Sequence, residues 1–395
     1  MNLLFNLVAV QPIHSAKFHG GGSYGEVVFR ALVKDGYEGC KIFCAYDGCK
    51  YLNSELVELC KAKNIPLMDI REKSPQQIID ENKVDAFYTP LYSLEARWQI
   101  KVPRFVFTWH GVRALELCYS SLGWSFSKKL GQKLESLVRY RKSWKKYFYK
   151  PKYKQLAARI AQGQTQAITV SEHSRASIKG FFPELRHAEI PVFYSPMEEG
   201  LACCGEANDS LPDGVSPKKY FLLTSGARWE KNNLRAVIAL DELIDDYKKC
   251  GEKFPYKVVV TGATNKKVYL NKIRHKEFFV LLDYVENHEL EMLHQHAYAF
   301  IFPSLNEGFG YPPMQSMSYG VPVAASGTTS IPEVCGDAAI YFDPYSVSEI
   351  KNRIIQLLDL EIYQEYSARA KMRYAQVHER QKTDLQKTVD FILGK

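Results

Sequence analysis

Several features that define other protein classes are missing from this sequence of 395 residues. No apolar run approaches the roughly 18–20 residues that a helix needs to cross a bilayer. The apolar residues 1–10 follow no basic residue and lead into Gln11 and Pro12, so we interpret them as a buried strand and not as a signal peptide. The chain has no internal repeat and no low-complexity segment. These absences argue against a membrane-spanning, secreted or repeat protein.

Paired cysteines are missing as well. The nine cysteines are odd in number and contain no Cys-x-x-Cys pair. The early cysteines Cys40, Cys44, Cys49 and Cys60 do not follow the spacing of a structural zinc site. We therefore expect buried free thiols, and a reducing cytoplasm as the compartment.

Acidic residues are almost absent from residues 124–160. This segment has twelve basic residues and one acid, so its net charge of +11 leaves −3 for the rest of a chain whose total is +8. Aromatic and aliphatic residues alternate with these lysines and arginines. Basic side chains attract anionic lipid headgroups by about 1 kcal/mol each, and aromatic rings favour the membrane interface. We predict peripheral attachment to an anionic membrane surface; a solvated helical insertion and a nucleic-acid patch are the alternatives.

Length and periodicity indicate two α/β domains. The chain exceeds the roughly 250–300 residues at which a single core stops growing, and strands alternate with helices in both halves. A stretch rich in Gly, Pro, Asn and Asp at 202–218 predicts a linker. The predicted strands are 3–10, 41–45, 86–89, 104–108 and 167–170 in the first half, and 220–224, 257–261, 278–282, 299–302 and 321–325 in the second.

Residues 303–322 form the most informative motif of the chain. The apolar run 298–302 ends at a proline and a serine, and an acid and two glycines follow, which predicts a strand, a tight loop and a helix. Gly308 and Gly310 have no Cβ, so the loop backbone can approach a ligand closely. Pro312 and Pro313 fit the first turn of a helix, where a missing amide donor costs little.

The same motif brings polar groups to one place. Free backbone amides at the start of the helix favour an anion. Glu307 offers a carboxylate to ligand hydroxyls, and Gln315, eight positions later, can present an amide to the same cleft. An ordinary α/β loop, with glycines in a turn and an acid that caps a helix, is the alternative interpretation.

The motif resembles the signature of the retaining glycosyltransferases of family 4. The flanking sequences at 307–310, 320–323 and 331–337 are similar to the family too. The family's helix carries two glutamates with seven residues between them; Glu307 stands in place of the first, and Gln315 replaces the second. The resemblance implies that Glu307 and the amides after it hold the donor sugar, and that position 315 contacts the ribose of the nucleotide. An amide makes a weaker hydrogen bond than a carboxylate, so we expect a weakened ribose contact.

The resemblance also implies a fold and a domain organisation. The expected fold class is α/β, in the GT-B architecture: two doubly wound Rossmann-like domains that face an interdomain cleft, with ligands at the carboxyl ends of the strands. Residues 1–201 are then the acceptor-binding domain, with the basic segment 124–160 as an insertion. Residues 219–376 are the nucleotide-sugar donor-binding domain. Residues 377–395 are expected to form a helix that crosses back to the first domain.

Further site residues are expected after predicted strands. Arg228 and Lys231 match the arginine and lysine that neutralise the leaving nucleoside diphosphate in the family, although their spacing here is short. Two surface cations at a helix start are the alternative, which the helix dipole disfavours. His110 resembles the first-domain histidine that touches the donor sugar; a core histidine bonded to the backbone is its alternative.

A glycine turn at 20–22 is a weaker candidate. Ser23 and Glu26 have the spacing of a capping box, which predicts that a helix begins at Ser23. Gly21 and Gly22 would then border the phosphates or the acceptor, with a flexible loop as the alternative. The predicted catalytic residues are Glu307, Lys231, Arg228 and His110, and the predicted donor-binding residues are Gly21, Gly22, Gly226, Asn232, Gly308, Phe309, Gly310, Tyr311 and Gln315.

No Asp-x-Asp triplet occurs in the sequence, which removes the usual magnesium or manganese clamp of the other large glycosyltransferase fold. We expect no metal and no bound cofactor, because Arg228, Lys231 and helix-start amides can neutralise the diphosphate. The predicted reaction transfers a hexosyl or deoxyhexosyl group, with retention, from a nucleoside-diphosphate-sugar to a hydroxyl of a saccharide acceptor. We expect this acceptor to be lipid-linked, at the inner face of the cytoplasmic membrane, in surface polysaccharide or glycolipid assembly.

Other functions remain open from the sequence alone. A sugar phosphorylase or a nucleotide-sugar epimerase shares the GT-B shape. A non-catalytic glycan- or nucleotide-binding protein is motivated by Gln315. We expect no nucleic-acid partner, although a nucleic-acid patch is an alternative interpretation of the basic segment 124–160.

Overall fold

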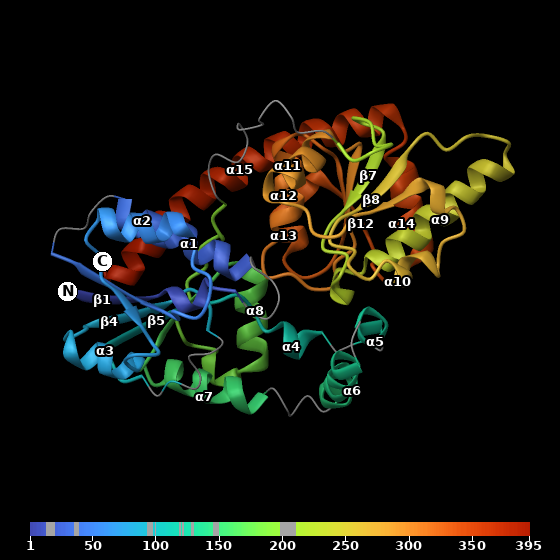
Figure 1. Ribbon diagram of the computed structural model, residues 1–395. Helices are drawn as coiled ribbons and strands as arrows, with labels where there is room; N and C mark the ends of the chain where they lie inside the picture. The colour runs from blue at the N-terminus through green and yellow to red at the C-terminus, as the bar shows by residue number, and fades with distance from the viewer. Residues whose placement is uncertain are drawn as a thin grey trace. The chain divides into compact units, whose positions relative to one another are not determined.

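A computed structural model describes residues 1–12, 20–34, 39–92, 98, 100–117, 120, 122–127, 130–144, 150–197 and 211–395. The chain forms two compact units (Figure 1). The first unit holds Met1–Val112, Tyr149–Glu198 and His378–Lys395, and the second holds Arg113–Phe148 and Glu199–Val377. The predicted linker lies partly outside the described residues, at 202–210, and the predicted domain boundaries stay predictions.

A parallel six-stranded sheet forms the core of the first unit. Its strand order, β3-β2-β1-β4-β5-β6, is that of a doubly wound α/β domain. The strand interiors are buried, as a sheet with helices on both faces requires; Leu3, Leu4 and Phe5 of β1 have no exposed surface. The strands are β1 Asn2–Asn6, β2 Lys41–Tyr46, β3 Leu67–Asp69, β4 Ala86–Thr89, β5 Arg104–Trp109 and β6 Gln166–Thr169.

Helices connect these strands. Local signals explain some of their ends: Ser74 and Gln77 form a capping box at the start of α3, and Pro75 occupies its first turn. Ser171 caps the start of α8 by accepting a bond from the backbone N–H of Ser174. The helices of the unit are α1 Gly20–Lys34, α2 Ser54–Ala62, α3 Pro75–Glu81, α7 Lys150–Ala161 and α8 Glu172–Phe181.

The first predicted strand, 3–10, is too long. The chain leaves the sheet at Asn6 and turns into a short 3-10 helix, Leu7–Ala9. Asn6 causes this change, because its side chain accepts a hydrogen bond from the backbone N–H of Val8 at 3.1 Å and donates one to Thr89 Oγ1 at 3.1 Å. A buried asparagine of this kind caps a turn, and the apolar pattern around it conceals the strand's end.

The predicted glycine turn at 20–22 is wrong, because α1 already begins at Gly20. Tertiary packing overrides the low helix propensity of glycine here. Gly25 lies so close to neighbouring elements that a Cβ would stand 2.5 Å from Val10 Cγ1. The hydroxyl of Tyr24 also bonds Thr108 Oγ1 at 3.1 Å, which fixes the helix against β5.

The second unit repeats the architecture of the first. Its strand order is β12-β11-β10-β7-β8-β9, and all pairs are parallel. The strands are β7 Tyr220–Leu223, β8 Lys257–Val260, β9 Phe279–Leu281, β10 Ala299–Phe302, β11 Val323–Ser326 and β12 Ala339–Phe342. The prediction of two α/β units with parallel sheets is confirmed, although it missed β3 and β12.

Helices pack around this second sheet, and α9 and α14 lie side by side (Figure 1). The helix predicted after residue 310 is confirmed as α12, with prolines in its first turn. Three helices of residues 113–144 belong to this unit as well. The helices are α4 Arg113–Glu116, α5 Leu122–Phe126, α6 Leu130–Trp144, α9 Asn233–Lys249, α10 Lys267–Leu270, α11 Asn287–His296, α12 Tyr311–Ser318, α13 Ile331–Cys335 and α14 Val347–Gln356.

The last helix, α15 (Leu360–Leu393), has residues in both units. Its end is anchored in the first unit, where the guanidinium of Arg104 donates to the carbonyl oxygens of Phe391 and Ile392. The buried carboxylate of Asp384 accepts a bond from the backbone N–H of Tyr194 at 2.9 Å. Within the described ranges, no helix is long and apolar enough to span a bilayer.

Replacement of Asp384 tests this anchor. Asp384→Ala leaves the buried N–H of Tyr194 without an acceptor, so we expect the free energy of unfolding to fall by about 1–3 kcal/mol in chemical denaturation. Glu379→Ala, at an exposed position of the same helix, is the control and should change it by less than about 0.5 kcal/mol. Equal losses in both variants would show that Asp384 does not anchor the helix.

Candidate functional site

Two loops of the second unit hold most of the predicted site. One loop follows β7 and contains Arg228 and Lys231; the other follows β10 and contains Glu307. β7 and β10 are neighbours at the centre of the sheet, and from them the strand order runs outward in opposite directions. Doubly wound sheets bind ligands at this switch point, outside the carboxyl ends of the strands. The topology therefore brings together residues that are 76 positions apart in the chain.

A buried ion pair joins the two loops. Lys231 Nζ lies 2.6 Å from Glu307 Oε1, and Ser304 Oγ donates to the same oxygen at 2.5 Å. The lysine side chain is 6% exposed and the glutamate 16%. Glu307 Oε2 accepts no hydrogen bond from any described residue. The pair thus fixes one carboxylate oxygen and leaves the other to accept from a ligand.

The pKa values of both groups are shifted by their surroundings. Burial raises the pKa of Glu307, but the charge of Lys231 and the hydrogen bonds from Lys231 and Ser304 outweigh it, so that this pKa lies below its ordinary value. Burial lowers the pKa of Lys231, and the charge of Glu307 only partly restores it. The carboxylate therefore stays ionised at neutral pH, while the lysine loses its proton more readily than an exposed lysine.

Asn232 links the two loops from inside. Its backbone is left-handed, with φ 58°, and its amide donates to the carbonyl oxygens of Pro303 at 3.0 Å and Pro344 at 2.7 Å. Its side-chain oxygen accepts from Arg235 at 2.5 Å, and the residue is 2% exposed. The polar atoms of this side chain thus bond other parts of the protein, and the predicted contact of Asn232 with the donor stays a prediction.

Hydroxyl groups before α13 fix the Glu307 loop. The backbone N–H of Glu307 donates to Thr329 Oγ1 at 3.1 Å. Ser330 Oγ donates to the carbonyl oxygens of Glu307 at 2.9 Å and Phe309 at 2.7 Å. Sequence reasoning missed Ser304, Thr329 and Ser330 as supporting residues. Thr329 and Ser330 bond a loop more than twenty residues away, which the sequence does not reveal, whereas Ser304 lies only three positions before Glu307.

Arg228 is held by a residue that the sequence analysis did not single out. Its Nε and Nη2 donate to Glu230 Oε1 at 3.0 and 2.9 Å, and Arg113 of α4 lies 3.3 Å from the same oxygen. Burial raises the pKa of Glu230, but the two arginines outweigh it, and the pKa lies below its ordinary value. The Arg228 side chain is 47% exposed, so it can move from this carboxylate to an anionic ligand.

Two positions of the site require glycine for different reasons: Gly226 has no room for a side chain, and Gly310 has a backbone conformation that other residues rarely adopt. A Cβ on Gly226 would lie 3.0 Å from Val260 Cγ1 and 3.1 Å from the Cα of Ala263. Gly310 has φ +135°, a conformation that L-residues rarely adopt, at the start of α12. Gly226 thus lets its loop pack closely, and Gly310 supplies the backbone conformation from which α12 starts.

The remaining candidates on the Glu307 loop differ in exposure. Gly308, Tyr311 and Gln315 are half-buried, whereas Phe309 is 4% exposed and contacts the ring of Tyr311, with centroids 5.6 Å apart. The side-chain amide of Gln315 makes no hydrogen bond with any described residue. Its contact with a ribose stays a prediction.

Three candidates lie in the first unit. His110 directly follows β5, and its Nε2 lies 2.8 Å from the carbonyl oxygen of Pro90, a backbone bond of the kind expected for a core histidine. Tyr24 packs edge-on against its ring, with centroids 4.8 Å apart. Gly21 and Gly22 belong to the first turn of α1. Their roles stay predictions. Among the described residues, no three His, Cys, Asp or Glu side chains gather as metal ligands would.

Comparisons with known proteins point to one family. Residues 213–376 match the sequence model of the family described as Glycosyl transferases group 1. A curated relative, O-antigen chain mannosyltransferase B of Escherichia coli, is 40% identical over 215 residues, which are 50% of this chain and 52% of the relative. The chain thus spans about half the length of that relative.

Solved structures share the fold over the whole chain. A glycosyltransferase from Rickettsia africae is similar with a TM-score of 0.62, at 14% identity, over 99% of this chain and 98% of its own. Anabaena HepE in complex with UDP and glucose gives a TM-score of 0.63, at 14% identity, over 100% of both chains. At this identity the likeness concerns the fold alone, and it confirms the predicted GT-B architecture.

The buried ion pair makes a testable contribution to stability. Lys231→Met leaves the carboxylate of Glu307 without its countercharge, so we expect unfolding to cost about 3–5 kcal/mol less than in the wild type. The double variant Lys231→Met/Glu307→Gln removes both charges and should recover at least about 1 kcal/mol of this loss. Denaturant unfolding of the wild type, Lys231→Met, Glu307→Gln and the double variant measures both effects, and strictly additive losses would exclude a coupled pair.

The pH dependence provides a second readout of the pair. The pKa of Glu307 is lower in the folded protein, so its contribution to stability is complete above the unfolded value of about 4.3. It is lost as the pH falls through the lowered folded value. Without Lys231, burial raises the pKa of Glu307, so the stability difference between wild type and Lys231→Met should shrink as the pH falls from above the unfolded value through the lowered folded value. A difference that stays constant over this range would contradict the assignment.

Proposed function

We propose that this chain transfers a sugar from a nucleoside-diphosphate-sugar to a hydroxyl of a saccharide acceptor, because residues 213–376 match the model of the family Glycosyl transferases group 1. The transfer retains the configuration of the anomeric carbon. The observation that supports this most strongly is the Lys231–Glu307 pair at the switch point of the sheet. It places a cation for a diphosphate beside a carboxylate for sugar hydroxyls.

The anionic residue of the site binds the sugar, and the cationic residues bind the diphosphate. Glu307 Oε2 accepts from hydroxyls of the donor sugar and orients the ring, while Oε1 stays bonded to Lys231 and Ser304. Lys231 and Arg228 neutralise the charge that develops on the leaving diphosphate. Arg228 exchanges Glu230 for the phosphate oxygens, which is favoured because an arginine binds two phosphate oxygens at once.

The reaction occurs on one face of the sugar. The bond from the anomeric carbon to the phosphate oxygen breaks, and its electron pair leaves with the nucleoside diphosphate. The acceptor oxygen bonds the anomeric carbon from the same side, and its proton passes to the departing phosphate oxygen. No protein nucleophile is required, so Glu307 positions the sugar without attacking it.

The relatives suggest which sugar and which setting. The Escherichia coli relative is named an O-antigen chain mannosyltransferase, which supports a mannosyl donor and an acceptor in surface polysaccharide assembly. HepE was solved with UDP and glucose, which supports a nucleoside diphosphate as the leaving group. We propose a mannosyl group as the transferred sugar.

Replacement of Glu307 tests the proposed role directly. Glu307→Gln keeps the size of the side chain and removes its charge, so we expect kcat/KM for nucleotide-sugar turnover to fall by about 10²–10³-fold. Nucleoside diphosphate release measures turnover, and product NMR reports the anomeric configuration. Glu252→Gln, an exposed carboxylate of the same unit, is the control and should behave as the wild type. Unchanged turnover in Glu307→Gln would exclude the role.

A surface of α6 supports membrane attachment. Leu130, Leu134, Leu137 and Val138 recur at helical spacing and are 72%, 54%, 38% and 47% exposed. We call these four residues the apolar ridge of α6. Single exposed leucines are ordinary, but four on one face of a basic helix form an amphipathic surface. We propose that the ridge enters an anionic membrane surface, while the positive charge of 124–160 attracts the headgroups. Residues 128–129 and 145–149 of that segment lie outside the described residues.

Liposome flotation tests this attachment. Leu134→Gln/Val138→Gln keeps good helix formers and removes two apolar side chains, so we expect about tenfold weaker binding to vesicles with anionic lipid. Ile355→Gln/Met372→Gln removes two exposed apolar residues elsewhere in the second unit and should bind as the wild type. Equal binding of wild type to anionic and purely zwitterionic vesicles would contradict the electrostatic part of the proposal.

A further inference from the structure

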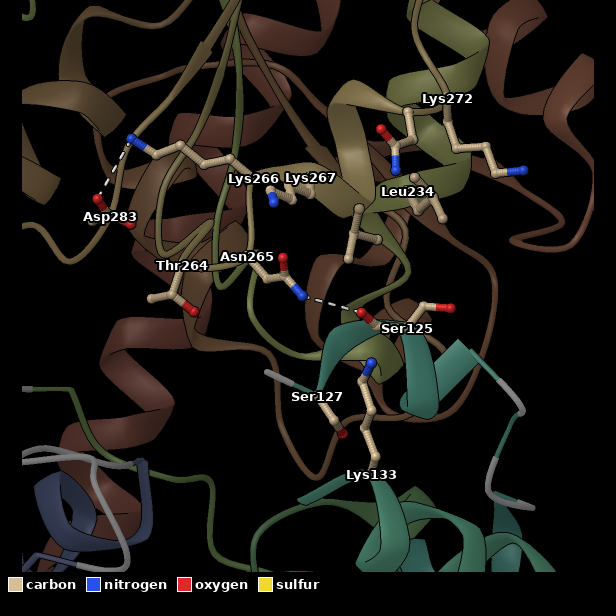
Figure 2. A pocket seen from close by; sticks show the side chains of 12 residues that line it. Ser125, Ser127, Lys133, Leu234, Thr264, Asn265, Lys266, Lys267, Lys272 and Asp283 are labelled. Atoms are coloured by element: carbon tan, nitrogen blue, oxygen red, sulfur yellow. Dashed lines mark hydrogen bonds and ion pairs between the residues drawn. The ribbon is translucent and has the colours of Figure 1, made fainter. Parts of the chain in front are cut away.

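The second unit contains an open pocket of about 870 Å³ that none of the predicted site residues lines (Figure 2). One wall comes from the segment of α5 and α6, with Ser125, Ser127 and Lys133. The opposite wall comes from the loop after β8 and from α10. A volume of this size holds a small ligand or the head of a larger one.

The lining of the pocket carries an excess of positive charge. Four lysines line it, Lys133, Lys266, Lys267 and Lys272, against a single carboxylate, Asp283. Lys266 lies 3.4 Å from that carboxylate. The three other lysines have no carboxylate within ion-pair distance among the described residues. Like charges gathered without countercharge repel one another, so the pocket is electrostatically prepared for an anion with several negative oxygens.

The two walls are held together by specific contacts. The side-chain amide of Asn265 donates to the carbonyl oxygen of Ser125 at 3.1 Å, and the rings of Phe126 and Tyr269 meet edge-on, with centroids 6.0 Å apart. Figure 2 shows Lys133 extending from α6 toward Ser125 and Asn265. Lys133 also lies 5.8 Å from the ring centroid of Trp124. These contacts keep the α6 lysine facing the lysines of the α10 segment.

The helix that supplies Lys133 also carries the apolar ridge. Leu134 follows Lys133 directly, and Leu130 and Leu137 lie one turn before and after it. The ridge is exposed, whereas Lys133 is half-buried against the pocket. One short helix therefore presents an apolar surface and a cationic pocket next to each other. A ligand that uses both must combine a hydrocarbon chain with a strongly anionic head.

We propose that this pocket binds the diphosphate of a lipid diphosphate, with the hydrocarbon chain along the apolar ridge of α6. The inference rests on the proposed function, because such a lipid would carry the acceptor saccharide to the enzyme. The lysines recognise the two phosphates, and the hydroxyls of Ser127 and Thr264 can add hydrogen bonds. The acceptor saccharide would be attached to the second phosphate. By binding the diphosphate, the pocket then selects diphosphate-linked acceptors over free saccharides.

Direct binding of farnesyl diphosphate tests the pocket without turnover. We expect Lys267→Glu/Lys272→Glu to weaken this binding at least about tenfold in isothermal titration, because two phosphate partners become repulsive. The matched control is Lys253→Glu/Lys276→Glu. These two exposed lysines precede β8 and β9 at the amino ends of the strands, whereas the pocket lies beyond the carboxyl end of β8. The charge change is the same in both double variants. The control should bind within about twofold of the wild type.

Further arms identify the source of the affinity. Leu134→Gln/Val138→Gln should weaken farnesyl diphosphate binding and leave inorganic pyrophosphate binding unchanged, because pyrophosphate has no chain. Equal weakening of farnesyl diphosphate binding by the pocket and control variants would overturn the proposal, since only net charge would matter. So would displacement of farnesyl diphosphate by UDP or GDP, which would assign the pocket to the donor nucleotide. The proposal would also be overturned if Lys267→Glu/Lys272→Glu weakened binding to anionic vesicles as much as it weakens farnesyl diphosphate binding. The pocket would then be part of a general membrane-binding surface.

A variant of the donor site separates this inference from the proposed function. Lys231→Met should abolish sugar transfer and retain farnesyl diphosphate binding, once thermal unfolding has shown that the variant is folded. Intact farnesyl diphosphate binding with no wild-type turnover of any nucleotide sugar would contradict the proposed function alone. Normal turnover with no farnesyl diphosphate binding would contradict the pocket alone.

Discussion

The buried ion pair between Lys231 and Glu307 is the constraint on which the rest of the donor-binding site depends. Removing two charges from water costs several kcal/mol for each ion, and their attraction offsets this only with good geometry and further hydrogen bonds. Ser304 supplies such a bond to the carboxylate, and the Phe302 ring lies 5.2 Å from the lysine nitrogen. The pair survives because Asn232 and the hydroxyls before α13 hold both loops in place. Its position, at the centre of the sheet, is fixed by the strand order.

This arrangement connects stability to the proposed chemistry. A buried lysine is ready for a diphosphate, because the charge of the ligand replaces the hydration that burial has already removed from the lysine. Glu307 keeps its charge at neutral pH, and one of its oxygens has no partner among the described residues. Arg228, which is half exposed, is likewise bonded to a carboxylate, that of Glu230. The basic pocket beside α6 differs, since three of its four lysines have no such countercharge among the described residues.

Much of the fold and part of the site could be predicted from the sequence. Continuous apolar runs and the Glu307 motif carry strong local signals, and the resemblance placed Lys231 and Glu307 in the same site. What failed depends on partners far along the chain. Asn6 ends a strand through Thr89, and Gly25 inside α1 lies where a Cβ would meet Val10. The edge strands β3 and β12 are short apolar runs, which the sequence does not distinguish from other buried segments. The engagement of Asn232 with two proline carbonyls is equally invisible in the sequence.

The most direct measurement compares the affinity of a nucleotide sugar with that of its free nucleoside diphosphate, in wild type and Glu307→Gln. The account predicts that the sugar adds affinity in the wild type and adds little in the variant, because the carboxylate contacts the sugar. The nucleoside diphosphate itself should bind both proteins with similar strength, since Lys231 and Arg228 remain. A sugar increment that survives in Glu307→Gln would contradict the central claim that this carboxylate holds the donor sugar.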